Sequence, residues 1–438
     1  MARLVSARRD EGEYRQDVAE QQRRPGGMPP PGQRDGCALD GPLGVVVRPT
    51  FAHIDLDAVR ANYRAVLSYV GGGAGRPDVI AVVKANGYGH GAVPVARALE
   101  AAGAGMLACA DIEEGVELRR GGVRASILVF GALSVSDLDG VFTHRLTPTI
   151  SSPFAARALR DAAMRRGARV ACHLKIDTGM NRLGFRYDNL TQTVPAVLDG
   201  AGLEIDAVYT HFATAEDRAH PLFDVQRARF DAAVRCLAEL GLRPRLRHAA
   251  NSAALLRERA TWYGAVRPGL LLYGVAPAGY AGVLPLTPVM SLRSRVVAVK
   301  GMRVGETAGY GARSPVMRPT KVAVVPAGYA DGLDVRIAGR GSVIVGGHRV
   351  PVVGSVCMDS ITIDVTDLDV APGDEVVLLG TQAGASIDVG EVAAAIGTVP
   401  HEILCRIGSR IIRTYDAEPR RESTTARHAD GDAPPAER

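Results

Sequence analysis

The stretch VIAVVKANGYGHGA, residues 79–92, decides the fold and raises the question of function. It begins as an apolar run typical of a buried strand and ends in a glycine-rich turn. Lys84 stands where the predicted strand stops. If the strand belongs to a parallel barrel, its carboxyl end lies on the face where such barrels carry catalytic groups. A desolvated amine there has a lowered pKa and can form a Schiff base with an aldehyde. The alternative is an ordinary lysine whose amine reaches solvent.

Lysine is rare in this chain. Of its 52 lysine and arginine residues, only four are lysine, namely Lys84, Lys175, Lys300 and Lys321, and 48 are arginine. Arginine therefore serves wherever a plain positive charge is enough. A lysine here is more informative than usual, because only its amine can lose a proton and react.

Seven further apolar runs alternate with amphipathic helical patterns after residue 84. The strands expected from this pattern lie at residues 79–83, 105–110, 126–130, 146–150, 169–176, 205–212, 246–250 and 263–267. Eight such strand–helix units predict a (β/α)8 TIM barrel, an α/β fold. A doubly wound open sheet is the structural alternative.

The sequence pattern changes near residue 285. From there, runs of β-branched residues separated by glycine-rich turns predict a mostly β C-terminal domain. Both ends of the chain are rich in Arg, Pro, Gly and small polar residues, and such segments bury little surface. We therefore expect a disordered N-terminal extension at 1–47, the barrel at 48–284, the β domain at 285–416 and a disordered tail at 417–438.

Composition excludes several classes of protein. The net charge of +5 is small for 438 residues and is spread along the chain, so no nucleic-acid partner is expected. The six cysteines stand singly, without the spacing of a metal site or a disulfide framework. No apolar run is long enough for a membrane span, and no secretory signal is visible. A cytoplasmic protein without a metal fits these features.

Several stretches resemble, in order, sequence blocks of the alanine racemase family, whose members are barrel enzymes that use pyridoxal phosphate. They are AVVKANGYGHG, LKIDTGMNRLG, THFATAED, HAANSAALL, RPGLLLYG, AGYGA, PAGYADG and VCMDSITIDVTD. Together with RPTFAHIDLDAVRANYRAV, which precedes them, these blocks are spread over nearly all of residues 48–415. The resemblance implies interconversion of L-alanine and D-alanine, pyridoxal 5'-phosphate as cofactor, and a supply of D-alanine for peptidoglycan. It also implies a homodimer with active sites shared between subunits.

The resemblance implies that Lys84 holds the cofactor and that Lys84 and Tyr310 are the two catalytic bases. Racemisation removes a proton from one face of the α-carbon and returns one to the other, so one base on each face is the simplest arrangement. A free phenol is a poor base near neutral pH and needs activation. In the family this tyrosine comes from the neighbouring subunit.

The resemblance also assigns a phosphate-binding set. Tyr88 would donate its phenol, and Asn251 and Ser252 would lie at the start of a helix. The backbone amides of Gly269 and Leu270 would complete the set. Free amides and hydroxyls attract phosphate without a dedicated lysine.

Arg267 would lie against the pyridine nitrogen of the cofactor, with His211 beside the ring. An arginine does not release its proton and so discourages protonation of that nitrogen. This favours racemisation over transamination. A decarboxylase of the same barrel class is expected to carry a carboxylate at that place.

The resemblance also implies that Arg182 and the backbone amide of Met358 bind the substrate, and that Lys175 occupies a position that is carbamylated in many family members. Two departures from the family pattern stand out. His401 replaces a common tyrosine that in the family helps to bind phosphate and narrows the substrate entry. Asn181 replaces a common glycine, which is expected to shift its loop slightly.

Two other functions stay open. One is a racemase of broader specificity, acting on serine or basic amino acids. The other is a non-catalytic protein that binds pyridoxal phosphate, although such proteins lack the β domain that carries Tyr310.

Overall fold

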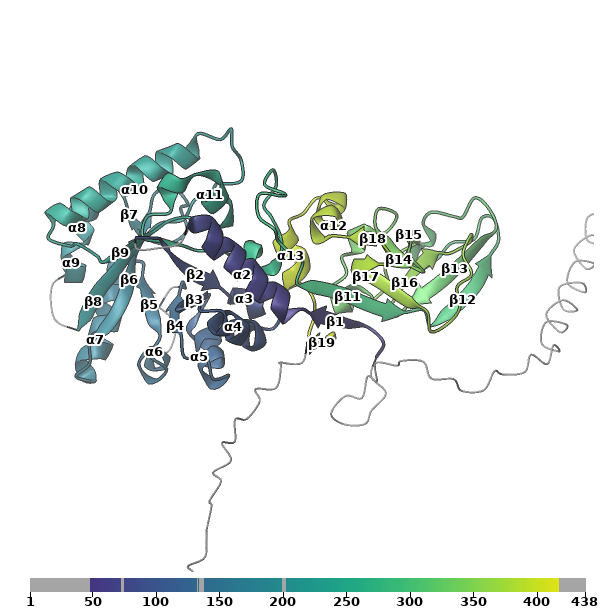
Figure 1. The fold of residues 1–438 in the computed structure, drawn as a ribbon, viewed down its shortest axis with the longest axis horizontal. Helices are drawn as coiled ribbons and strands as arrows, with labels where there is room; N and C mark the ends of the chain where they lie inside the picture. Colours follow the sequence, from purple (N-terminus) through teal and green to yellow (C-terminus); the bar gives the residue numbers. More distant parts are fainter. Residues whose placement is uncertain (1–47, 72–74, 132, 134–137, 199–201, 417–438) are drawn as a thin grey trace, which may run out of the picture. The chain divides into compact units, whose positions relative to one another are not determined.

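The structure is a computed structural model that describes residues 48–71, 75–131, 133, 138–198 and 202–416 (Figure 1). The predicted disordered extension at 1–47 and the predicted disordered tail at 417–438 lie outside the described residues.

Within the described residues, eight parallel strands close into a barrel, as predicted. They pair in the order β2, β3, β4, β5, β6, β8, β9, β10, and β10 pairs back with β2. This closing pair excludes the open doubly wound sheet. The strands are β2 (Asp78–Val82), β3 (Met106–Cys109), β4 (Ser126–Val129), β5 (Thr147–Ile150), β6 (Val170–Asp177), β8 (Leu203–Tyr209), β9 (Leu246–His248) and β10 (Ala265–Val266). The short strand β7 (Phe185–Arg186) pairs with β6.

The barrel strands are apolar in continuous runs because both of their faces are covered. Val79 to Val82 are all buried, as are Leu107 to Cys109. Helices flank the outside of the strands (Figure 1), and such burial on both faces removes the alternating pattern of a half-exposed strand. The helices are α2 (Leu56–Val70), α4 (Ala92–Ala101), α5 (Ile112–Arg120), α6 (Asp139–Thr143), α7 (Pro153–Arg165), α8 (Leu190–Thr193), α9 (Pro195–Leu198), α10 (Leu222–Glu239) and α11 (Ser252–Arg257).

Side-chain caps fix where several of these helices start. Asp55, Asp111, Ser152 and Asn251 each precede a helix and accept a hydrogen bond from a backbone N–H three residues further on. Each cap satisfies one of the amides that a helix start leaves without a partner.

The second sheet is formed mainly by the chain after residue 285, as the mostly β prediction required. Its strands pair in the order β12, β13, β16, β15, β14, β17, β11, β1, β19, and β18 pairs with β17. They are β1 (Phe51–Ile54), β11 (Met290–Arg295), β12 (Ala298–Met302), β13 (Thr320–Val325), β14 (Ser342–Val345), β15 (His348–Val353), β16 (Ile361–Asp364), β17 (Glu375–Gln382), β18 (Ala385–Ile387) and β19 (Ile412–Tyr415). Two helices, α12 (Val389–Ile396) and α13 (Pro400–Cys405), follow β18.

Strand β1 differs from the sequence prediction. It lies in the segment assigned to the barrel, yet it pairs antiparallel with β11 and parallel with β19. Strand β1 buries Ala52 and Ile54, and its ladder partners among the described residues are the two strands of the second sheet. Strand β1 thus precedes the barrel in the sequence but belongs to the second sheet. The boundary between residues 284 and 285 stays a prediction.

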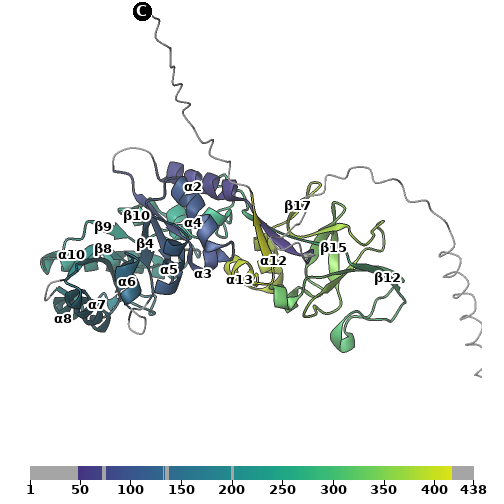
Figure 2. The ribbon, with the colours of Figure 1, turned by 90° about the horizontal axis from the view of Figure 1, so that it is seen from below.

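Helix α13 lies beside the turn that follows β2 (Figure 2), and two residues of β19 bond to the same segment. Arg413 donates from Nε to the carbonyl of Gly89 at 2.7 Å, and the Tyr415 hydroxyl donates to the carbonyl of His90 at 3.2 Å. At Gly89, a Cβ would lie 2.1 Å from the carbonyl oxygen of Leu404, so only glycine fits. The end of the folded chain thus helps to hold the segment around Lys84.

Among the described helices, none combines the length and the apolar character needed to cross a bilayer.

Candidate active site

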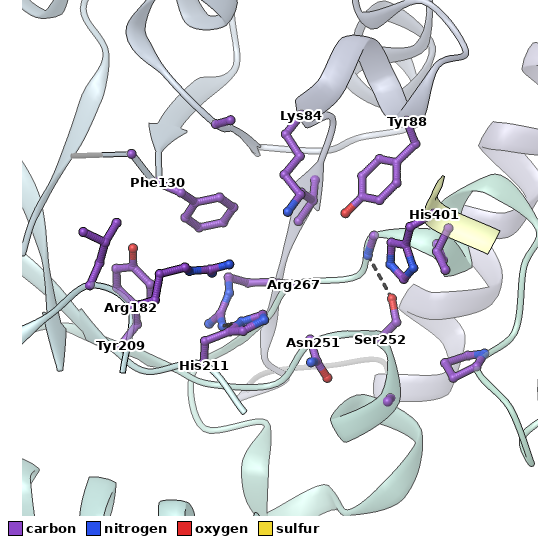
Figure 3. Close-up of a pocket in the computed structure, with 18 of the residues that line it drawn as sticks. Lys84, Tyr88, Phe130, Arg182, Tyr209, His211, Asn251, Ser252, Arg267 and His401 are labelled. Atoms are coloured by element: carbon purple, nitrogen blue, oxygen red, sulfur yellow. Dashed lines mark hydrogen bonds between the residues drawn. The ribbon is translucent and has the colours of Figure 1, made fainter. Parts of the chain in front are cut away.

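Lys84 follows the carboxyl end of β2, where the sequence placed it, and points into a cavity of about 330 Å³ (Figure 3). The cavity collects most of the residues that the sequence singled out. These are Lys84, Tyr88, Lys175, Arg182, His211, Asn251, Ser252, Arg267, Gly269, Leu270 and His401. Burial lowers the pKa of the Lys84 amine, and the positive charge of Arg182 lowers it further. A larger fraction of this amine is therefore neutral than of a lysine in water.

One end of the cavity offers hydroxyl and amide donors. The Gly269 N–H donates to Ser252 Oγ at 3.0 Å (Figure 3). A Cβ at Gly269 would lie 2.4 Å from the Tyr88 hydroxyl oxygen, so the close approach of the phenol requires glycine. Asn251 caps α11 through Oδ1, which accepts from the Ala254 N–H at 3.0 Å. Such a donor set suits a phosphate.

Arg267 is almost fully buried and donates to four acceptors. Nη1 donates to Nδ1 of His248 at 2.7 Å. Nη2 donates to the carbonyls of Thr210 and Ala249, at 2.8 and 2.9 Å, and to Nδ1 of His211 at 3.2 Å. A guanidinium can only donate, so both imidazoles accept through Nδ1 and carry their proton on Nε2.

The two imidazoles beside Arg267 are neutral. Burial of its ring lowers the pKa of His211 well below its usual value, and the charge of Arg267 adds to this. Burial lowers the pKa of Arg267 itself to about 10, which leaves the guanidinium charged at neutral pH. The cavity thus presents a fixed cation held by neutral acceptors, and this cation is a poor proton donor.

Lys175 is buried, and its Nζ lies 5.6 Å from the centroid of the Tyr209 ring. Burial lowers the pKa of its amine to about 8, and the charges of Arg182 and Arg267 contribute. An amine with this pKa is partly neutral at pH 7, and carbamylation needs the neutral form. The geometry is compatible with the predicted carbamate, which stays a prediction that electron density beyond Nζ would test.

Asn181, one of the two departures, stands in a left-handed conformation with φ of 55°. Its N–H and that of Gly179 donate to Oδ1 of Asp177, at 3.1 and 2.9 Å. Asparagine tolerates this region better than other residues with a Cβ. The loop before Arg182 therefore accommodates the replacement of glycine.

Asn181→Val should lower the free energy of unfolding by about 1–2 kcal/mol, because a β-branched residue is strained at positive φ. Urea unfolding followed by circular dichroism measures this change. Asn181→Gly is the matched control and should cost less, since glycine adopts the same conformation without strain. A valine variant as stable as the wild type would contradict this strain argument.

Tyr310 and Met358 are not brought to the cavity. Tyr310 begins a 3₁₀ turn after β12 with 78% of its surface exposed, and Met358 is 51% exposed. Tyr310 lines a separate hollow of the β domain with residues such as Arg313 and Met317. Within a single chain, Lys84 therefore shares the cavity with the other predicted site residues, whereas Tyr310, the second predicted base, and Met358 lie outside it.

Sequence reasoning missed several residues of the site. Phe130 and Tyr209 line the cavity, and His248 holds Arg267. The location of His248 at the end of β9 was the one available signal. His401, the second departure, has its ring centroid 5.9 Å from that of Tyr88. Burial lowers the pKa of His401, and Lys84 adds to this, so a neutral ring forms part of the wall.

Comparison with known proteins gives matches along both domains. The family models for the N-terminal and the C-terminal domain of alanine racemase match residues 54–277 and 289–415. The alanine racemase of Symbiobacterium thermophilum is 41% identical over 382 residues, which span 87% of this chain and 99% of that protein.

Solved structures give the same picture. The alanine racemase of D-cycloserine-producing Streptomyces lavendulae superimposes with a TM-score of 0.81 at 34% identity, covering 86% of this chain and 99% of that one. The alanine racemase of Bartonella henselae, solved with covalently bound pyridoxal phosphate, gives a TM-score of 0.75 at 31% identity, covering 84% and 99%.

Proposed function

Since the chain belongs to the alanine racemase family, we propose that it interconverts L-alanine and D-alanine with pyridoxal phosphate bound in the Lys84 cavity. The family assignment makes the protein a racemase, and so an isomerase. The observation that carries the proposal is the amine of Lys84, which shares one cavity with Arg267 and with the donor set of Ser252, Gly269 and Tyr88.

The residues present fit the cofactor. Lys84 would hold its aldehyde, and Arg267 would hold its ring nitrogen. Its phosphate would be held by the hydroxyls of Tyr88 and Ser252 and by the backbone amides of Gly269 and Leu270. When bound, pyridoxal phosphate withdraws electrons from an attached amino acid and so acidifies the α-proton.

Lys84 would move one of the two protons. Burial and the charge of Arg182 lower the pKa of its amine, so Nζ can accept a proton from the α-carbon and return one to it. Arg182 would also bind the substrate carboxylate, which holds the α-carbon near the amine.

Arg267 would direct the reaction towards racemisation. It retains its proton, and its neighbours His211 and His248 are neutral acceptors. With no acidic proton offered to the ring nitrogen, electron density stays near the α-carbon, where the new proton arrives.

Tyr310 would supply the second proton from a second copy of the chain, and the backbone amide of Met358 would bind the substrate carboxylate in the same way. The high exposure of both residues supports this arrangement, because exposed side chains are free to contact a partner. The active form would then be a homodimer that works in the cytoplasm and supplies D-alanine for peptidoglycan.

Turnover on a panel of L-amino acids tests the proposal. The purified protein with pyridoxal phosphate should racemise L-alanine with a higher kcat/KM than L-serine or L-arginine, as measured by chiral chromatography. A preference for serine or arginine would point to the racemase of broader specificity. Bound cofactor without turnover on any amino acid would point to the non-catalytic alternative.

A further inference from the structure

Lys84 is the first residue of a one-turn helix whose following residues have left-handed backbone conformations. In α3 (Lys84–Tyr88), Ala85, Asn86 and Gly87 have φ of 54°, 53° and 60°, and Tyr88 follows with φ of 51°. Glycine adopts these values without strain, whereas each of the other residues adds a conformational strain of about 1–2 kcal/mol. Residues four apart lie on one face of a helix turn. The turn therefore points the amine of Lys84 and the phenol of Tyr88 into the same cavity.

A strained turn persists only where its surroundings hold it, and one carboxylate contacts it directly. Glu114 lies in the first turn of α5, half-buried. Its Oε1 accepts from the Ala85 N–H at 2.6 Å, and its Oε2 accepts from the Ala110 N–H at 2.7 Å. The start of α5 has its own cap in Asp111, which accepts from the Glu114 N–H at 2.9 Å. The Glu114 carboxylate is therefore not needed as a helix cap.

The carbonyl side of the turn has a second support. His90 is buried, and its Nδ1 lies 3.0 Å from the Gly87 carbonyl and 2.9 Å from the Tyr88 carbonyl. Since carbonyls only accept, Nδ1 carries the proton. Asn86 adds a third bond, with Oδ1 accepting from the Ala92 N–H at 2.8 Å.

We propose that Glu114 is a positioning residue whose carboxylate holds this left-handed turn and thereby aims the Lys84 amine at the reacting carbon. The role of Lys84 rests on the proposed function, whereas the support of the turn does not. The site needs a carboxylate because two N–H groups face it. A glutamine offers one acceptor oxygen, and its NH₂ would point at the second N–H. Burial raises the pKa of the Glu114 carboxyl, and the N–H groups of Ala110 and Ala85 oppose that rise.

Glu114→Gln and Glu113→Gln form a matched pair. Glu113 is the neighbouring residue on the same helix turn, has the same charge and is exposed. In the holoenzyme, hydrogen exchange of the peptide covering residues 84–92 should be at least about 10-fold faster in the Glu114 variant, because a hydrogen bond to a charged group is lost. The kcat should fall about 10-fold or more with KM within about 2-fold, since the base is misplaced while substrate binding is kept. The Glu113 variant should match the wild type in both measurements.

Unchanged exchange in Glu114→Gln would overturn the proposal, and so would equal effects in the two variants. A loss of kcat without faster exchange would also overturn it, because the turn would then not be the cause. If Glu114→Gln does not fold, Glu114→Asp keeps both acceptor oxygens one carbon shorter. It should show the same two effects at smaller size, and wild-type behaviour would again count against the proposal. A wild-type protein without racemase turnover would remove the proposed function, while the exchange measurement would still test the support of the turn.

Discussion

Lys84→Ala should abolish racemisation, with turnover falling by at least about 10⁴-fold. The variant loses the side chain that would hold the cofactor and would also carry a proton to and from the α-carbon. The buried cavity gives no other amine the same location, because Lys175 lies beside Tyr209 and Arg267. Absorbance of the purified protein with pyridoxal phosphate, before and after borohydride reduction, reports covalent attachment. Chiral chromatography reports turnover.

Lys300→Ala is the matched control for this variant. Lys300 lies on β12, is exposed and does not line the cavity, so attachment and turnover should stay at wild-type values. A reducible adduct that persists in Lys84→Ala, at Lys175 or elsewhere, would contradict the assignment of Lys84.

Tyr310→Phe should impair proton exchange from one enantiomer of alanine far more than from the other, by about 10²- to 10⁴-fold. The change removes the hydroxyl and keeps the ring, and Tyr310 is 78% exposed, so the fold should be unaffected. With Lys84 intact, the α-proton on its own face should still exchange. Deuterium incorporation from D₂O into L-alanine and into D-alanine, followed separately by mass spectrometry, measures both faces.

Tyr69→Phe, on the barrel helix α2, is the control and should leave both exchange rates unchanged. Equal losses from the two enantiomers would contradict one base on each face. Mixing Lys84→Ala with Tyr310→Phe tests the shared site. A heterodimer has one site with both bases, so the mixture should recover about a quarter of wild-type turnover. No recovery under conditions of subunit exchange would contradict a site built from two chains.

The barrel was predictable because its signal is local. A parallel strand buried on both faces is encoded as a short apolar run, and the eight predicted runs overlap the eight barrel strands, β2 to β6 and β8 to β10, in order. Strand β1 was not predictable in this way. Its partners β11 and β19 lie far away along the chain, and a four-residue strand does not encode which sheet it joins.

The site residues also divide into those with a local sequence signal and those whose role depends on contacts between distant segments. Lys84 was visible as a rare amine at the end of a strand, and the glycine-rich turn after it was visible too. Glu114 and His248 were not, because their importance lies in bonds to Ala85, Ala110 and Arg267 that sequence spacing does not reveal.

By itself, the sequence determined the order of the strands, the place of the reactive lysine and the kinds of side chain around it, because burial on a periodic element is encoded residue by residue. Only the tertiary structure decided the chemical state of those groups. It lowers the pKa of Lys84 through burial and the charge of Arg182, and it makes His211 and His248 acceptors of Arg267. It also leaves Tyr310 exposed, outside the cavity of its own chain. These properties depend on desolvation and on distances between segments that meet only after folding.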